Sequence, residues 1–157
     1  MRKRIIDPTS ERLGTLAKGW LDLERAAVVE VTSEDERYPV ESAFGSGDAR
    51  GWRAAAAGHQ TIRLIFDYPQ RLKCVSLVFE EDEIGRTQEF VLRWSSDGGR
   101  TLKEIVRQQW NFSPPDSIRE LEQYQVDLHS VNVLELVIKP DIAGGGARAS
   151  LRNLRLS

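Results

Sequence analysis

A segment in the second half of the chain places polar and aromatic side chains next to one another. Residues 107–112 read Arg-Gln-Gln-Trp-Asn-Phe. A planar indole beside amide and guanidinium donors suits a sugar ring or a peptide. Trp110 and Phe112 also share a face with Val106 under two-residue alternation, so packing in the core or at a sheet edge explains the same pattern. The candidate ligand-binding residues of this segment are Arg107, Gln109, Trp110 and Asn111.

Three further candidate donors, Arg53, His59 and Arg86, lie in or beside glycine-containing loops. Loops carry binding residues more often than the strands that they connect, because the scaffold holds them at the surface. We expect the loops that carry Arg53 and Arg86 to meet the segment 107–111 at one end of the domain. Together these side chains would hold a polar ligand.

Four acidic residues follow one another at 80–83. They could bind a cation, or act as the paired carboxylates of a glycoside hydrolase, which must lie at a defined separation across a cleft. Consecutive residues of a hairpin point in alternating directions and into water. A solvated turn is therefore the simpler interpretation.

The residue types of a nucleophilic triad are present in Ser95 and Asp97 together with His59 and His129. The serine lacks the strained strand-to-helix turn that presents the nucleophile of many hydrolases. The following Asp-Gly-Gly favours a tight hairpin, which explains these residues without catalysis. The run 144–146 of three glycines lacks the Lys-Ser/Thr and the helix of a phosphate loop. We expect no catalytic residue and no enzyme activity.

The composition argues against several classes of partner. The 157 residues carry a formal net charge of -2, which provides no positive field to attract nucleic acid or an anionic membrane. Cys74 is the single cysteine and there are two histidines, which excludes a disulfide within the chain and leaves little material for a zinc site. No apolar run suits a signal peptide or the ~20 residues of a membrane helix. We expect a cytoplasmic protein.

Apolar residues are spaced as in β-strands from Ala26 onward. Short blocks rich in β-branched and aromatic residues alternate with clusters of Gly, Asp, Pro and Ser, the rhythm of an antiparallel sandwich or barrel. Residues 61–67, for example, place Ile62, Leu64 and Phe66 on one face. Pro69 and its neighbours at 68–70 predict a turn after this strand. The predicted strands are 26–32, 61–67, 72–80, 87–95, 102–112, 118–128, 131–139 and 149–156.

The length fits one core. The sequence therefore predicts an all-β fold, an antiparallel β-sandwich of the jelly-roll type at residues 25–157. Residues 1–24 mix charge, proline and glycine with a few apolar positions and are expected to form an N-terminal arm laid over the domain. Trp20 in this arm could cover one end of the sandwich or contact a partner.

Three blocks of sequence carry a resemblance to a known family. They are Trp52 with the strand at 60–67, the hairpin at 90–101, and the strand at 133–138 with the closing segment 149–156. In this order and spacing they resemble the discoidin family, the coagulation factor V/VIII type C domains of the galactose-binding-like superfamily. The resemblance covers about residues 26–156. It implies a jelly roll that binds carbohydrate, without catalysis, through loops at one end.

The chain departs from the family at the positions that hold ligands. Sugar-binding members carry a His soon after the loop tryptophan, whereas Arg53 follows Trp52 here. Members also carry an Arg and an Asn in a later hairpin, where this chain has acidic residues, so galactose specificity is not implied. Many members hold a structural calcium ion with a Glu near the C-terminus. Asn153 stands near that position, which leaves Asp48 and loop carbonyls as candidate ligands for calcium.

Two functions of different classes fit these observations. The first is a non-catalytic binding domain that recognises a saccharide-like ligand, with carbohydrate expected on family resemblance. The second is a protein-protein docking module, for which an exposed apolar patch joining Trp20 to the sandwich would be evidence. A monomer or a weak homo-oligomer is expected in either case.

Overall fold

The computed structural model describes residues 19–45 and 50–157, so Asp48 and most of the predicted arm lie outside the described residues. Strands dominate this part of the chain, and their ladders are antiparallel. The predicted antiparallel β-sandwich is confirmed. In chain order the elements are α2 (Leu23–Ala26), β1 (Ala27–Val31), the 3-10 turn η1 (Val40–Ala43), β2 (Trp52–Ala57), β3 (Gln60–Glu80), β4 (Arg86–Ser95), β5 (Lys103–Phe112), β6 (Arg119–Lys139), β7 (Arg148–Leu151) and β8 (Asn153–Leu156).

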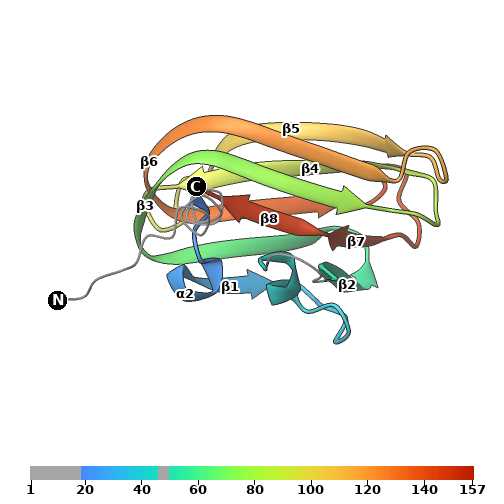
Figure 1. Cartoon of the computed structure of the whole chain (residues 1–157), viewed down its shortest axis with the longest axis horizontal. Coiled ribbons are helices and arrows are strands. Elements are labelled where there is room, and N and C mark those ends of the chain that lie inside the picture. Colours follow the sequence, from blue (N-terminus) through green and yellow to red (C-terminus); the bar gives the residue numbers. More distant parts are fainter. Residues whose placement is uncertain (1–18, 46–49) are drawn as a thin grey trace, which may run out of the picture.

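Two long strands, β3 and β6, run through both layers of the sandwich (Figure 1). Their halves at 60–65 and 133–138 pair with each other in a sheet of strand order β1-β3-β6-β4-β5. Their other halves, 72–80 and 119–128, pair in the second layer, where β8 joins β3. Both strands bend at one end of the molecule (Figure 1). The loop between β3 and β4 and the loop between β5 and β6 therefore lie at the other end.

The turn predicted at residues 68–70 is wrong, because these residues lie inside β3. Pairing with β6 shifts register between Ile65 and Gln70, and shifts again before Cys74. Pro69 has no amide hydrogen to donate to a ladder, and proline within sheets is found at edges and bulges. Irregular pairing thus lets the strand bend from one layer into the other without reversing direction.

The separate strands predicted at 118–128 and 131–139 are likewise one strand, β6. Ser130 has a φ of 57°, in the left-handed region that non-glycine residues rarely adopt. This residue lies at the bend of β6, opposite the bend of β3. The boundary that the sequence predicted between residues 128 and 131 is therefore a bend within one strand.

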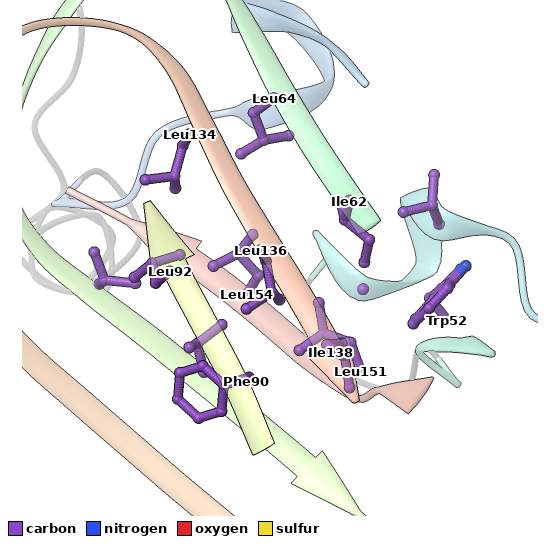
Figure 2. Close-up of a cluster of buried hydrophobic side chains, with 14 of the residues drawn as sticks. Trp52, Ile62, Leu64, Phe90, Leu92, Leu134, Leu136, Ile138, Leu151 and Leu154 are labelled. Carbon is purple, nitrogen blue, oxygen red and sulfur yellow. The ribbon is translucent and has the colours of Figure 1, made fainter. Parts of the chain in front are cut away.

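The apolar faces predicted for the strands meet in one core between the layers (Figure 2). Ile62, Leu64 and Phe66 of β3 are buried, as alternation predicted. The rings of Phe79 and Phe90, from opposite layers, lie 5.1 Å apart. Burying one such side chain contributes about 1.5–3 kcal/mol. The core is therefore the main source of stability.

The described part of the predicted arm, from residue 19 onward, packs against the core of the sandwich. Leu23 of α2 is 2% exposed and lies in the core. The amide of Leu21 donates to the carbonyl of Leu156 at 2.7 Å, so the segment continues the edge at β8. Within the described residues, no helix has the length and apolar character to cross a membrane.

Candidate functional site

A hollow of about 190 Å³ lies at the end of the sandwich where β3 ends and β6 begins. The short β2–β7 ribbon forms one side of it, because Trp52 pairs with Leu151 and Arg53 pairs with Ser150. The far side is the loop that follows Glu80. We call this hollow the end pocket; its lining residues are Tyr38, Arg50, Trp52, Arg53, Glu80, Asp82, Ile118, Ser150, Leu151 and Arg152.

Aromatic side chains form part of its wall. The indole of Trp52 is 1% exposed and its Nε1 donates to the carbonyl of Ser33 at 3.0 Å, so this ring is fixed. Tyr38 is half-buried, and the guanidinium of Arg53 lies 5.1 Å from the centre of its ring. The amide of Arg53 also donates to the carbonyl of Tyr38 at 3.2 Å, which ties the loop at 32–39 to β2.

Charged groups of both signs face the end pocket. Arg152 Nε donates to Glu80 Oε1 at 2.9 Å. Arg50, Arg53 and Asp82 are exposed. Guanidinium groups offer several donors in a fixed fork and carboxylates offer acceptors. The pocket can therefore bind a ligand that carries both hydroxyl groups and negative charge.

The acidic run at 80–83 forms an ordered turn rather than a pair of catalytic carboxylates. Glu81 accepts hydrogen bonds from the amides of Glu83 at 3.1 Å and Ile84 at 3.3 Å. It also accepts from Arg86 Nε at 2.8 Å. Burial raises the pKa of Glu81, but the bonds from Arg86 and the two amides outweigh burial, so its pKa lies below the usual value. This ion pair positions Asp82 at the pocket.

Arg86 lies inside the sandwich and not at the pocket. It is 6% exposed, and its Nη1 donates to the carbonyl of Pro140 at 2.6 Å. Its guanidinium also lies 4.9 Å from the centre of the Phe112 ring. These contacts and the ion pair with Glu81 use its donors within the protein. We assign Arg86 to the architecture of the loops.

The polar residues predicted on β5 face outward from the large sheet. Arg107 pairs with Glu89 at 3.1 Å, and Gln109 Nε2 donates to the same carboxylate at 2.9 Å. Asn111 Oδ1 accepts from the hydroxyl of Thr87 at 2.5 Å. His59 shares a separate hollow of about 190 Å³ with Arg107 and Glu89. Arg107, Gln109 and Asn111 lie on a strand face, and His59 lies in the loop before β3. They do not line the end pocket with Arg53.

Trp110 points to the opposite side of β5, into the interior. It packs against the core, and its Nε1 is buried. The predicted ligand set is therefore divided among several places. His59, for example, also lines a hollow of about 130 Å³ between the loop before β3 and the loop after β6. Arg53 is the predicted residue that lines the end pocket.

The sequence pointed to the loops at 48–53 and 81–86, which contain Arg50 and Asp82, but it did not single out Tyr38 or Arg152 as ligand candidates. Tyr38 and Arg50 lie in loops far along the chain from Arg152, and no spacing rule joins them. A weak signal existed at Arg152, because Arg152 and Asn153 interrupt the alternation between Leu151 and Leu154. In the structure this interruption separates β7 from β8.

Within the described residues, neither His59 nor His129 forms a hydrogen bond with the Ser95 and Asp97 that were considered for a nucleophilic triad. Ser95 Oγ donates to Asp97 Oδ1 at 2.6 Å, and Asp97 also accepts from the amide of Thr101 at 2.9 Å. This is the predicted hairpin turn, and these bonds lower the pKa of Asp97 to about 2. His129 Nε2 lies 3.4 Å from Asp127 Oδ1, and both side chains are exposed at the bend of β6.

The expected calcium site is tested by the surroundings of Asn153. Its Nδ2 donates to the carbonyls of Ala43 at 3.3 Å and Gly45 at 2.9 Å. These oxygens thus face an amide donor and not a cation. Within the described ranges, no group of three or more His, Cys, Asp or Glu side chains is placed to hold a metal ion. The described residues do not fit a structural calcium ion, because Asn153 already supplies the donor that links the loop to β8.

Replacing Asn153 by Asp is expected to create a requirement for calcium. A carboxylate would face the carbonyls of Ala43 and Gly45 and destabilise the fold by about 1–3 kcal/mol, the cost of unpaired buried polar groups. Millimolar calcium should restore part of this loss, because oxygen ligands suit that ion. Thermal unfolding with calcium and with a chelator measures the effect. Asn153→Ala, which adds no carboxylate, is the control; a wild-type melting temperature that itself rises with calcium would contradict the interpretation.

No protein-family model and no curated protein sequence matches this chain. Solved structures do match it. The CBM32 module of AlyQ, in complex with 4,5-unsaturated mannuronic acid, has a TM-score of 0.62 at 15% identity, over 88% of this chain and 97% of that chain. The family 32 module from C. perfringens NanJ, in complex with galactose, has a TM-score of 0.59 at 14% identity, over 83% and 92%.

A pectin-binding carbohydrate-binding module is similar to the same extent, with a TM-score of 0.60 at 17% identity, over 85% of this chain and 91% of that chain. Each of these modules is aligned over most of its own length. At these identities the likeness establishes the fold. The chain shares the β-sandwich fold of these modules, as the sequence predicted.

Proposed function

We propose that this chain is a non-catalytic carbohydrate-binding domain of the discoidin-like type, and that the end pocket holds one sugar unit of its ligand. The observation that carries the proposal is the convergence of Tyr38, Arg53 and Arg152 with the carboxylates of Glu80 and Asp82. An aromatic ring bordered by charged donors and acceptors suits a ring that is apolar on its face and rich in hydroxyls at its edge. The shared fold with carbohydrate-binding modules supports the same choice.

The competing docking role depended on an apolar patch around Trp20. The guanidinium of Arg155 lies 5.9 Å from the centre of the Trp20 ring, and Arg119 and Arg152 line the hollow beside it. The surroundings of Trp20 are therefore strongly basic. We favour the saccharide ligand for this reason.

Tyr38→Ala is expected to weaken saccharide binding about tenfold. Loss of one aromatic contact costs roughly 1 kcal/mol of binding free energy, in addition to the effect of the lost buried area. Each loss of about 1.4 kcal/mol in binding free energy raises the Kd tenfold. A glycan array followed by titration calorimetry on the saccharide that binds most tightly measures the change.

Tyr68→Ala is the matched control, because Tyr68 is 76% exposed at the bend of β3, away from the end pocket. It should bind as the wild type does. Equal losses in both variants would remove the end pocket as the site. Absence of binding across neutral and acidic glycans would remove the proposed function.

A further inference from the structure

A second hollow, of about 310 Å³, lies beside the end pocket on the outer face of the smaller layer. We call it the arginine groove. It is formed by the second half of β3, the first residue of β6, β8 with the link that precedes it, the residue Gly45 and the segment before α2. The side chains that matter for its chemistry are Trp20, Ser76, Arg119, Arg152, Asn153 and Arg155.

Strand register explains why the arginines gather there. Ser76 of β3 pairs with Arg155 of β8, and Glu80 of β3 pairs with Arg119 of β6. Paired residues of an antiparallel ladder point to the same face. The small side chain of Ser76 thus lies between two strands that each carry an arginine on this outer face. A hollow with basic walls results.

The charge of the groove is opposite to that of the whole protein. Its lining contains three arginines and no acidic residue, whereas the chain has a formal net charge of -2. Glu80, which lines the neighbouring end pocket, forms an ion pair with Arg152. Within the described part of the chain, no carboxylate forms an ion pair with Arg119 or Arg155. Among the described residues, no carboxylate neutralises these two guanidinium groups, which suits the groove to an anionic ligand.

Arg152 lines both hollows, so the end pocket and the arginine groove are adjacent. The end pocket adds Arg50 and Arg53, which brings five arginines to one continuous surface. The end pocket has a volume of about 190 Å³ and the arginine groove a volume of about 310 Å³. Pockets for drug-sized ligands begin at ~300 Å³, so neither hollow is much larger than this lower limit. Each hollow is therefore suited to about one sugar unit.

We propose that the arginine groove is a second subsite and that the ligand is an acidic oligosaccharide whose carboxylate-bearing units span both hollows across Arg152. This inference rests on the proposed carbohydrate-binding function and names its ligand class. The planar fork of arginine donates two parallel hydrogen bonds to a carboxylate. Trp20, beside Arg155, offers an indole to the apolar face of a sugar ring.

The test compares ligands of equal length and different charge. Titration calorimetry would use hexagalacturonate, a neutral galactan hexasaccharide and a sulfated galactan hexasaccharide, with galacturonic acid as the single-unit probe. Hexagalacturonate should bind at least tenfold more tightly than the neutral hexasaccharide. Its affinity should fall as salt is raised, because exposed ion pairs are screened.

Arg119→Gln combined with Arg155→Gln should weaken hexagalacturonate binding at least tenfold and leave the affinity for galacturonic acid within twofold, because the single unit fits the end pocket. Arg100→Gln combined with Arg148→Gln removes the same charge from exposed positions that line neither hollow. This control should leave both affinities within twofold. Circular dichroism and the melting temperature verify that each variant is folded.

Equal loss in the groove variant and the control would reduce the effect to general charge attraction and overturn the subsite. Preference for the sulfated hexasaccharide would overturn the carboxylate assignment. Tight binding of the neutral hexasaccharide without preference for hexagalacturonate would overturn the inference and leave the proposed function standing. Failure of every saccharide to bind would remove both.

Discussion

Gly51→Ala is expected to lower the free energy of unfolding by about 2–4 kcal/mol and to abolish most ligand binding. Gly51 has a φ of +83°, and a Cβ atom there would lie 2.6 Å from the carbonyl oxygen of Leu151 and 2.8 Å from Arg152 Cα. Both contacts are with backbone, so no side chain can rotate away. The strand that begins at Trp52 would have to move away from β7, and Arg53 would move with it away from Arg152.

Gly58→Ala separates the two causes of the expected loss of stability, which are the strained backbone conformation and the steric contact with the neighbouring backbone. Gly58 also has a positive φ, +91°, but no heavy atom lies within 4 Å of the position of its Cβ. It should therefore lose only about 1–2 kcal/mol, from the backbone conformation. Chemical denaturation of both variants measures the difference, and titration with the best-binding saccharide measures the effect on the pocket. Equal stabilities for the two variants would show that the close approach of Gly51 to β7 is not a constraint.

Glu120→Gln is expected to make the protein more stable at alkaline pH and to flatten its dependence on pH. Glu120 is fully buried; its Oε1 accepts from Gln88 Nε2 at 3.1 Å, and its Oε2 has no partner within the described residues. Burial, and then the neighbouring carboxylate of Glu122, raise the pKa of Glu120 to about 9. A glutamine of the same shape keeps the bond to Gln88 and carries no charge at any pH.

The sign of the effect follows from proton binding. Below pH 4.5, the ordinary value for this group, both the folded and the unfolded states are protonated at Glu120. As the pH rises toward about 9, the unfolded state loses its proton while the folded state keeps it. Stability therefore falls by up to about 1.4 kcal/mol per pH unit over this window. The variant does not suffer this loss, so its advantage should grow to about 2–5 kcal/mol near pH 9.

Urea denaturation of the wild type and of Glu120→Gln between pH 5 and 9 measures this advantage. Glu24→Gln, at an exposed position of α2, is the control for removing one carboxylate. A carbon-13 titration of the Glu120 carboxyl gives an independent reading. An advantage that stays constant across the pH range would show that Glu120 is charged inside the fold.

The first half of β6 shows where alternation alone is ambiguous. The sequence offers Glu120 and Glu122 on one face and Leu121 on the other, and hydrophobicity favours Leu121 for the interior. The structure buries Glu120 completely and leaves Leu121 62% exposed. Glu120 pairs with Phe79, whose side chain lies in the core, so register places both on the inner face. The neighbouring strand decided the orientation.

The candidate site was less predictable than the fold. Arg53 was identified because it follows Trp52 in a loop of a recognisable pattern. Arg107, Gln109 and Asn111 were expected at the same end, but β5 places them on the outer face of the large sheet. A polar residue in a strand looks the same in the sequence whether its face meets a ligand or an ion-pair partner.

What the sequence determined by itself was the sandwich, because two-residue alternation is a local property that residues such as Ile62, Leu64 and Phe66 already carry. The tertiary structure decided the surface at which a ligand can bind. Arg53, Arg119 and Arg155 lie in three different strands and Arg152 lies in the link between β7 and β8. Only the bends of β3 and β6 and the register of the ladders bring them to one side of the molecule. Convergence of side chains depends on contacts between distant segments, and local spacing contains no information about those contacts.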